Sequence, residues 1–187
     1  GAPCTTSRIL PGLTLVSSEF DWPTPDELLQ AVNLPRRGDI VECQPHHVMG
    51  MELRDVDIGA LGGGDIRAFA DTLLAYPAKY AGLVEGECVV AFGFIPYWDG
   101  VAEGWMFSSK YLSRDKFIFH RAAAKGIEYV YTHAGLRRLQ FTIHSYNPLA
   151  IRWADVLGFT LEGRLRNYGP DGADYFMYSK VTKKVTK

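Results

Sequence analysis

The stretch from Leu139 to Phe159 constrains the fold more than any other part of this sequence. Its start, Leu139–His144, alternates apolar and polar side chains, which predicts a strand with one buried face. An Asn147-Pro148 pair then predicts a turn that leads into a helix over Pro148–Leu157. Gly158 ends that helix, and a new strand follows it. This strand–helix–strand unit fits ordinary α/β packing, and it also fits the cradle of a cofactor.

Periodic patterns divide the rest of the chain into further helices and strands. Short turns at Gly86 and over Pro96–Gly100 join consecutive strands and therefore predict antiparallel neighbours. Asp55 begins a turn toward Gly62, and Asp65 is a suitable cap for the next helix. The predicted strands are Val48–Arg54, Tyr80–Glu85, Cys88–Ile95, Val101–Ser108, Leu139–His144, Phe159–Arg166 and Tyr175–Val181, and the predicted helices are Asp26–Val32, Asp65–Ala75, Lys116–His133 and Pro148–Leu157.

This order of elements predicts an α+β (mixed α/β) fold with an open, mostly antiparallel sheet and helices on both faces. Residues 1–40 are rich in Pro, Ser and Thr, and we interpret them as an N-terminal extension. Residues 41–187 are interpreted as the single domain that a chain of 187 residues accommodates.

Composition argues against several classes of function. The formal net charge is −1, so binding to nucleic acid through general electrostatics is not expected. The sequence has 3 Cys without a C-x-x-C pair, which favours reduced thiols in a cytoplasmic setting over disulfides or zinc. His46-His47 has no further ligands at metal spacing, so no metal is expected. No apolar run is long enough to predict a membrane span.

The run from Gly135 to Arg166 resembles the C-terminal half of a GCN5-related N-acetyltransferase (GNAT). In that superfamily a strand ends in Asn, a small residue follows three positions on, and Gly-Phe closes a short helix; Asn147, Ala150 and Gly158-Phe159 match this pattern. Two further segments resemble the ribosomal-protein N-terminal acetyltransferase branch, namely Glu162–Arg166 and Gly172–Tyr178. A weaker likeness to GNAT-like domains of tailed phages is carried by His47, Met51–Asp57, Trp105 and Ile151–Trp153.

The resemblance implies a GNAT fold over about residues 45–181, in which the parallel strands Val101–Ser108 and Leu139–His144 splay apart to receive acetyl-CoA. It implies an amine acceptor, a cytoplasmic protein (host cytoplasm or virion for a phage protein), and leaves a homodimer open. The sequence departs from the family at the acyl-CoA signature, because Ser108–Phe117 contains no glycine. Either a modified loop holds the pyrophosphate, with charge from Lys110, Arg114 and Lys116 and with Ser113 as ligand or helix cap, or CoA binding is weak or lost.

The same resemblance assigns roles to residues along the two splayed strands. Glu103 is the expected general base, although a half-exposed strand glutamate is the plain alternative. The family's acid, a Tyr, is replaced by Trp153, so Tyr146 and His144 are the expected substitutes. Asn147 is expected to bind pantetheine or CoA, or else only to form the turn before Pro148. The remaining expectations are Met106, Phe107 and Ser108 as cofactor contacts and Trp98, Trp105 and Trp153 as the substrate pocket.

These observations leave three functions open. The first is an N-acetyltransferase that moves an acetyl group from acetyl-CoA to a protein N-terminus, a lysine or a small amine by direct attack. The second is a degenerate GNAT-fold scaffold or phage/host-interaction protein without catalysis. The third is transfer of a longer acyl or an aminoacyl group.

Overall fold

The computed structural model describes residues 20–60 and 66–181 of the chain. Its helices are α1 (Pro25–Val32), α2 (Pro45–Met49), α3 (Asp55–Ala60), α4 (Ile66–Leu74), the 3₁₀ helix η1 (Lys110–Asp115), α5 (Lys116–His133) and α6 (Pro148–Val156). Its strands are β1 (Gly38–Glu42), β2 (Ala78–Val84), β3 (Glu87–Trp98), β4 (Val101–Ser108), β5 (Arg138–His144), β6 (Thr160–Leu165) and β7 (Tyr175–Val181). Within these residues, no helix combines the length and the apolar character needed to cross a membrane.

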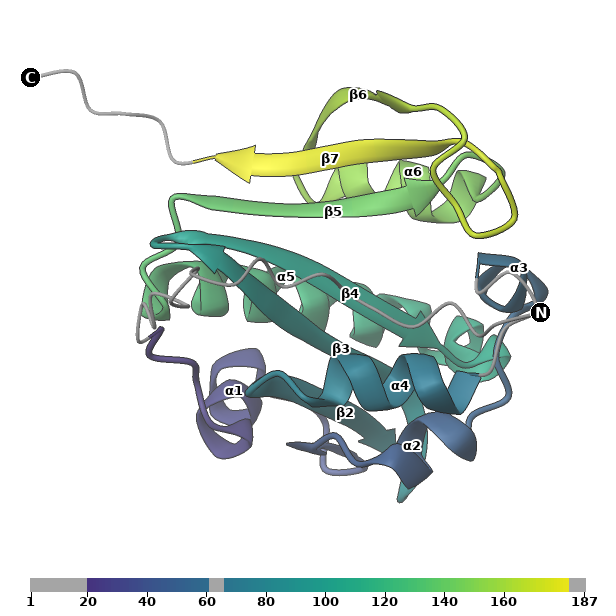
Figure 1. The fold of residues 1–187 in the computed structure, drawn as a ribbon. Coiled ribbons are helices and arrows are strands. Elements are labelled where there is room, and N and C mark those ends of the chain that lie inside the picture. The colour runs from purple at the N-terminus through teal and green to yellow at the C-terminus, as the bar shows by residue number, and fades with distance from the viewer. Residues whose placement is uncertain (1–19, 61–65, 182–187) are drawn as a thin grey trace, which may run out of the picture.

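The strands form one 7-stranded sheet in the order β1-β2-β3-β4-β5-β7-β6. All neighbouring pairs are antiparallel except β4 and β5, which are parallel. Figure 1 shows β4 and β5 close together at one end and diverging toward the other. The mostly antiparallel sheet with a splayed parallel pair, which the sequence resemblance implied, is therefore confirmed.

Helices cover the sheet on both faces, as predicted. The face that we call the helix face packs against α1, α5 and α6 through a large apolar core with Phe94, Leu139 and Val130 at its centre. The opposite face, called the front face, packs against α2 and α4 through a second core that includes Val48, Leu73 and Phe107. In Figure 1, α2 and α4 lie over the half of the sheet formed by β1–β4.

The α6 helix forms as its sequence predicts. The Asn147 side chain caps it by accepting a hydrogen bond from the Ala150 amide at 3.1 Å, and Pro148 occupies its first turn. Gly158 then adopts φ +81°, a left-handed conformation that L side chains rarely adopt, and turns the chain into β6. The strand–helix–strand unit over residues 138–165 is confirmed.

The predicted strand over Val48–Arg54 is wrong. Residues 45–49 form α2 instead, because Pro45 suits the first turn of a helix, and Val48 is the side chain that this helix buries. Only Leu53 pairs in β fashion, through an isolated bridge to Ser109. The predicted turn at Asp55 is also wrong, because α3 begins there. The proposed cap Asp65 lies outside the described residues.

The first strand of the sheet is β1, which the sequence analysis missed. It pairs with β2 and crosses the predicted boundary between residues 40 and 41. Before it, α1 carries a capping box between Thr24 and Glu27 and packs on α5, where Leu28 and Val32 are buried. Residues 25–42 therefore contribute to the same layers as the domain that follows them.

Candidate active site

The parallel pairing of β4 and β5 stops soon after both strands begin. Its register is Val101 with Arg138, Ala102 with Leu139 and Glu103 with Gln140. Both strands continue beyond these pairs, to Ser108 and His144, without further pairing to each other among the described residues. The splay therefore begins immediately after Glu103, and the strand edges beyond it face an opening. In Figure 1, α3 lies beside the wide end of this opening.

A cavity of about 320 Å³ occupies the opening and the space behind it. Its lining is mainly apolar and comes from both faces of the sheet. Trp105 and Thr142 line it from the front-face side of the strands, whereas Phe94 and Met106 line it from the helix face. We call this opening, which described residues line from both faces of the sheet, the passage.

Glu103 is held on the front face where the opening begins. The Tyr97 hydroxyl donates to Glu103 Oε2 at 2.9 Å, and Gln140 Nε2 donates to the same oxygen at 3.1 Å. No side chain in the described part of the chain donates to Oε1. Burial, followed by the nearby Glu103 carboxylate, raises the pKa of Tyr97, so its hydroxyl remains a donor at neutral pH. One carboxylate oxygen is therefore fixed, whereas the other has no side-chain donor among the described residues.

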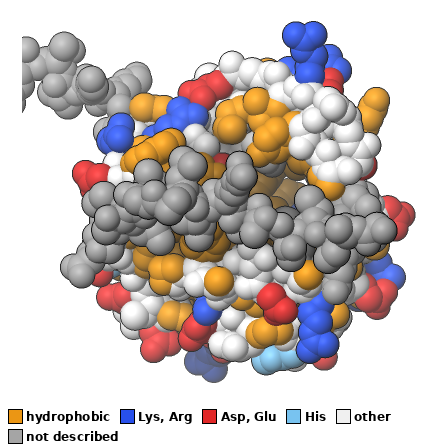
Figure 2. Space-filling model, in the orientation of Figure 1, with side chains coloured by type: hydrophobic (Ala, Val, Ile, Leu, Met, Phe, Trp, Pro, Cys, Tyr) orange, Lys and Arg blue, Asp and Glu red, His pale blue; other side chains and the backbone are white. Residues whose placement is uncertain are grey.

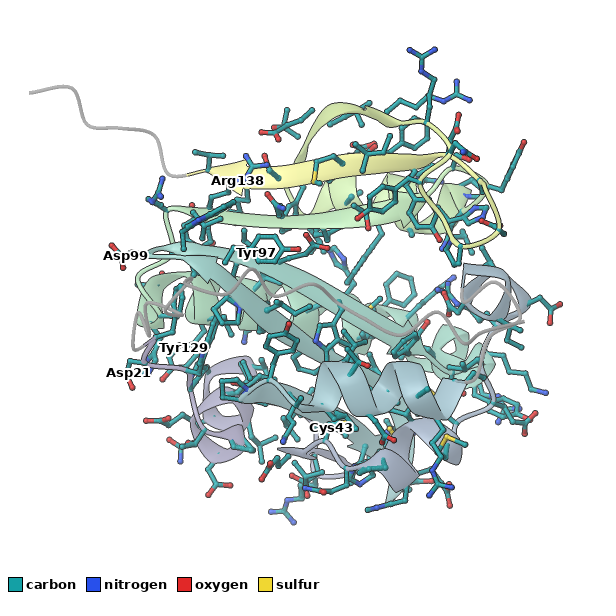
Figure 3. The ribbon with its side chains drawn as sticks, viewed as in Figure 1. Asp21, Cys43, Tyr97, Asp99, Tyr129 and Arg138 are labelled. Atoms are coloured by element: carbon teal, nitrogen blue, oxygen red, sulfur yellow. The ribbon has the colours of Figure 1, made fainter. Side chains whose placement is uncertain are left out.

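A chain of hydrogen bonds orients Gln140 from behind. Arg138 Nε donates to Gln140 Oε1 at 2.7 Å, which directs the amide nitrogen toward Glu103. The rest of the Arg138 guanidinium binds Glu162 at 2.8 and 2.6 Å, and Ser179 Oγ donates to Glu162 at 2.7 Å. Bonding to Arg138, then to Ser179, lowers the pKa of Glu162 to about 2. Figure 3 shows Tyr97 and Arg138 near the end where β4 and β5 meet.

Comparison with known proteins supports this description of the fold. No protein-family model matches the sequence, and no curated protein matches it significantly. The structure resembles an acetyltransferase of the GNAT family from Bacillus anthracis, with TM-score 0.60 and 18% identity over 78% of this chain and 95% of that chain. It also resembles yncA from Salmonella typhimurium, solved with its cofactor acetyl-CoA, with TM-score 0.57 and 16% identity over 81% and 98% of the two chains.

A third similar structure is the ribosomal-protein-alanine N-acetyltransferase from Brucella melitensis, with TM-score 0.58 and 16% identity over 76% of this chain and 99% of that chain. All three likenesses have TM-scores above 0.5, so they concern the fold as a whole. The chain has the GNAT fold. At these identities the likeness carries the fold, whereas the roles of individual residues rest on the geometry of this chain.

Within this GNAT fold, His144 lies at the end of β5 with both ring nitrogens engaged. The Tyr146 amide donates to Nδ1 at 3.1 Å, which leaves the ring proton on Nε2, where it faces Asp171 Oδ2 at 3.2 Å. A histidine held in this way has no nitrogen available for a substrate. The other expected acid, Tyr146, is 80% exposed and sits 5.7 Å from the His144 ring. The geometry argues against His144 as the acid and leaves Tyr146 as the candidate.

Trp153 stands in α6, where the GNAT family has its Tyr. Its indole stacks on Phe119 of α5 with ring centroids 5.2 Å apart, and its N–H donates to His120 Nδ1 at 3.2 Å. The only proton that Trp153 has to donate is therefore used inside the protein. Trp153 lines the cavity as an apolar wall.

Trp98 and Trp105, the other expected pocket residues, lie in different surroundings. Trp98 is 68% exposed at the end of β3 and does not line the cavity. Trp105 is half-buried on β4 and packs over Gly93, where an added Cβ would come within 2.6 Å of the indole. The buried Trp105 Nε1 has no hydrogen-bond partner among the residues that the structure describes.

The expected cofactor contacts on β4 differ in access. Met106 lines the cavity, whereas Phe107 and Ser108 are buried elsewhere and do not line it. Ser108 Oγ points instead to Asp57 of α3, at 3.5 Å. Asn147 is 8% exposed and lines the cavity while its side-chain oxygen caps α6. The structure thus brings Met106 and Asn147 to the cavity, but not Phe107 or Ser108.

The first amides of η1, between β4 and α5, already have acceptors among the described residues. The η1 helix runs directly into α5, and its first amides are bonded within the protein: Lys110 N to Glu52 O at 2.9 Å, Tyr111 N to Ser109 Oγ at 3.2 Å, and Leu112 N to Ser109 O at 3.1 Å. A helix start binds phosphate through amides that have no other acceptor. Those amides are occupied here.

The basic side chains of the same junction are partly engaged as well. Lys110 forms an ion pair with Glu52, and the Arg114 guanidinium lies over the Tyr111 ring, 4.6 Å from its centroid. Lys116 Nζ lies 5.2 Å from the exposed Phe117 ring. Nothing is described of the Ser113 side chain, so its expected capping or binding role stays a prediction.

Cysteine chemistry is not supported at the two described thiols. Burial raises the pKa of Cys43 to about 12 and that of Cys88 to about 11. Both therefore remain thiols at neutral pH, and a thiol is a poor nucleophile compared with a thiolate.

Sequence reasoning missed Tyr97, Gln140 and Arg138 as residues that hold Glu103. Gln140 and Glu103 lie far apart in the sequence, and only the register of the β4–β5 pair brings them together. The alternation within Leu139–His144 does place Gln140 on the polar face of its strand, which was the one available signal.

Proposed function

We propose that this protein is an acyl-CoA-dependent N-acyltransferase of the acetyl-transfer kind, acting on an amine. The observation that carries the proposal is the position of Glu103. Glu103 forms the last pair with β5 before the two strands splay, and its carboxylate has one oxygen fixed by Tyr97 and Gln140 and the other without a side-chain donor among the described residues. Acyl transfer to an amine requires a general base beside the space that holds the thioester.

The proposed reaction is direct transfer without an acyl-enzyme. Glu103 accepts a proton from the ammonium form of the acceptor, and the neutral amine nitrogen then bonds to the thioester carbonyl carbon. The carbon–sulfur bond breaks, its electron pair stays on sulfur, and the amide nitrogen loses its second proton to solvent. The departing thiolate takes a proton from Tyr146 or from water. The protonated state of both described thiols supports this route over one through cysteine.

The acyl and pantetheine parts of a CoA thioester fit the passage better than its phosphates fit the junction. The passage has unpaired strand edges and apolar walls, whereas the first amides of η1 already have acceptors. Phosphate binding would therefore depend on side chains, and Arg114 and Lys116 are the nearest cations on η1 and α5. The acceptor amine would approach Glu103 from the front face, past Tyr97.

Acetyl-CoA binding, measured by calorimetry and by thermal melting, tests the proposal. A ligand at a hundredfold excess over its dissociation constant should stabilise the protein by about 2.7 kcal/mol. Desulfo-CoA without the acyl group is the matched ligand control for the nucleotide end. Absence of heat and of any melting shift with acetyl-CoA would leave the protein without its donor and defeat the proposal.

A catalytically inactive scaffold is the second candidate, and one observation favours it. The bonded amides at the start of η1 leave the family's phosphate cradle closed. The scaffold predicts no acyl-CoA binding and no turnover with any of a protein N-terminus, a lysine peptide or a small amine. Binding of acetyl-CoA together with loss of turnover in Glu103→Gln would exclude it.

A further inference from the structure

The cavity behind the β4–β5 opening extends well beyond the space that an acetyl group needs. It continues on the helix face between the sheet and α5, where Phe119, Ala122 and Ile127 line it, and reaches Leu28 and Val32 of α1. An apolar cavity of about 150 Å³ accommodates a benzene ring. The cavity of about 320 Å³ here therefore has room for roughly ten to twelve carbons by the same measure.

Gly104 connects the opening to this cavity. It is the first residue of β4 after the last pair with β5, and its missing side chain would point to the helix face. A Cβ built there lies 3.8 Å from Phe94 and 3.9 Å from both Leu139 and the Gln140 carbonyl, which is ordinary contact distance. The gap at Gly104 is thus real space beside the thioester position, and a larger side chain would fill it.

The walls of this space can only bind an apolar group. Phe94, Leu139 and Val130 are almost fully buried, and the groups next to them on the helix face are aliphatic or aromatic. Charged lining residues come from β1, its preceding loop and the α3 region, and none of them lies within 4 Å of a Cβ built at Gly104: Arg37, Asp39, Arg54 and Asp57. Burial of methylene groups is the only sizeable source of affinity that such walls offer.

We infer that the donor of this protein is a medium-chain acyl thioester, whose chain passes Gly104 and lies in the apolar cavity between β4 and α5. The inference rests on the proposed function, because it places the thioester carbonyl beside Glu103. The chain supplies binding energy that the closed helix start at η1 does not provide through the phosphates. A donor held by its chain accounts for both features of the site.

The test is the dependence of affinity on chain length. Dissociation constants are measured by calorimetry for acetyl-, butyryl-, hexanoyl- and octanoyl-CoA, each below its micelle concentration. Each buried methylene should tighten binding by about fourfold. Octanoyl-CoA should therefore bind at least about a hundredfold more tightly than acetyl-CoA.

Substitutions at Gly104 test where the chain lies. Gly104→Ala should flatten the dependence on chain length, and Gly104→Val should remove it, so that octanoyl-CoA loses its advantage over acetyl-CoA. Both replacements suit a strand, so the melting temperature should not fall. Gly163→Val on β6 is the matched control, since an added Cβ there has nothing within 4 Å, and it should leave the dependence unchanged.

The outcomes separate this inference from the proposed function. Binding of acetyl-CoA with equal or weaker binding of the longer chains overturns the inference and leaves the proposed function standing. Binding of none of the thioesters overturns both. A chain-length dependence that survives in Gly104→Val also overturns the inference, because the chain would then lie elsewhere. The series in the unsubstituted protein decides the question even where a variant fails to fold.

Discussion

The β4–β5 opening and the β4–α5 junction are neighbouring parts of one site, and they use their polar groups in opposite ways. In the opening, Tyr97 and Gln140 leave one Glu103 oxygen available. At the junction, Ser109 and Glu52 take up the first amides of η1. The Glu103 carboxylate therefore keeps one oxygen without a side-chain donor among the described residues. The first amides of η1, in contrast, already have acceptors within the protein. In the proposed site, proton transfer and phosphate binding would therefore depend on separate groups.

The surface around the site agrees with this separation. Figure 2 shows Lys, Arg, Asp and Glu side chains interspersed around the edge of the front face, with hydrophobic side chains nearer its middle. The formal net charge of −1 likewise provides no excess of positive charge for a polyphosphate. The CoA donor must therefore be held by contacts with individual residues, because the net charge provides no general electrostatic attraction for its phosphates.

The largest expected effect comes from Glu103→Gln. The amide keeps the size of the side chain but cannot accept the proton of the amine, so kcat/KM should fall by about a hundredfold or more. Initial rates of thiol release measure it once an acceptor is found, and Glu87→Gln at an exposed position on β3 is the control. Equal rates in Glu103→Gln and the parent protein would rule out Glu103 as the base.

The next effect concerns the side chain that positions Glu103. Gln140→Leu removes one donor to Oε2, and because hydrogen bonds to charged groups contribute about 1.5–3 kcal/mol, the rate should fall by at least about tenfold. The pH profile of kcat/KM should move as well, which a general loss of stability would not cause. Gln30→Leu, on the exposed side of α1, controls for the change of side chain. An unmoved profile would show that Gln140 does not act on the base.

A smaller effect is expected at the junction. Glu52→Gln removes the carboxylate that pairs with Lys110, so a phosphate there would gain a cation and lose a repulsion. Acyl-CoA affinity should rise by up to about fivefold at low salt, and the gain should shrink as salt is added. Glu42→Gln breaks an exposed pair with Lys79 and serves as the control. An unchanged affinity would place the phosphates away from η1.

The smallest effect is on stability and its dependence on pH. Because Arg138 and Ser179 lower the pKa of Glu162 to about 2, its ionised form stabilises the folded protein above about pH 4.5, and this contribution is lost as pH falls toward 2. Glu162 is partly exposed, so Glu162→Gln should cost only about 1 kcal/mol at pH 7.

Denaturant unfolding at a series of pH values measures that contribution. The difference between Glu162→Gln and the parent protein should shrink between about pH 4.5 and 2, and Arg138→Gln should show the same trend. A difference that stays constant with pH would mean that the Arg138–Glu162 pair does not account for it.

Elements with a strong local pattern were predicted correctly, whereas elements with an ambiguous local pattern were not. The α5 helix and the strands β4 and β7 match their predicted bounds, because each has a strong period and clear turn residues at its ends. The error at Val48–Arg54 arose where a short apolar run fits a strand and a helix equally well. β1 was missed because Pro35 shortly before it and Gly38 at its first position are typical of a break between elements.

The sequence by itself determined the order of helices and strands from α4 onward, the Asn147 cap of α6 and the identity of Glu103 as a strand glutamate, since these depend on residues close together in the chain. Only the tertiary structure decided what surrounds them. The β4–β5 register brought Gln140 to Glu103, and the contact of Glu52 with the start of η1 closed the phosphate cradle. The packing of α5 on the sheet left a cavity behind Gly104 that has room for an acyl chain. Periodicity records which face of an element is apolar, whereas register and packing distance depend on partners distant in sequence.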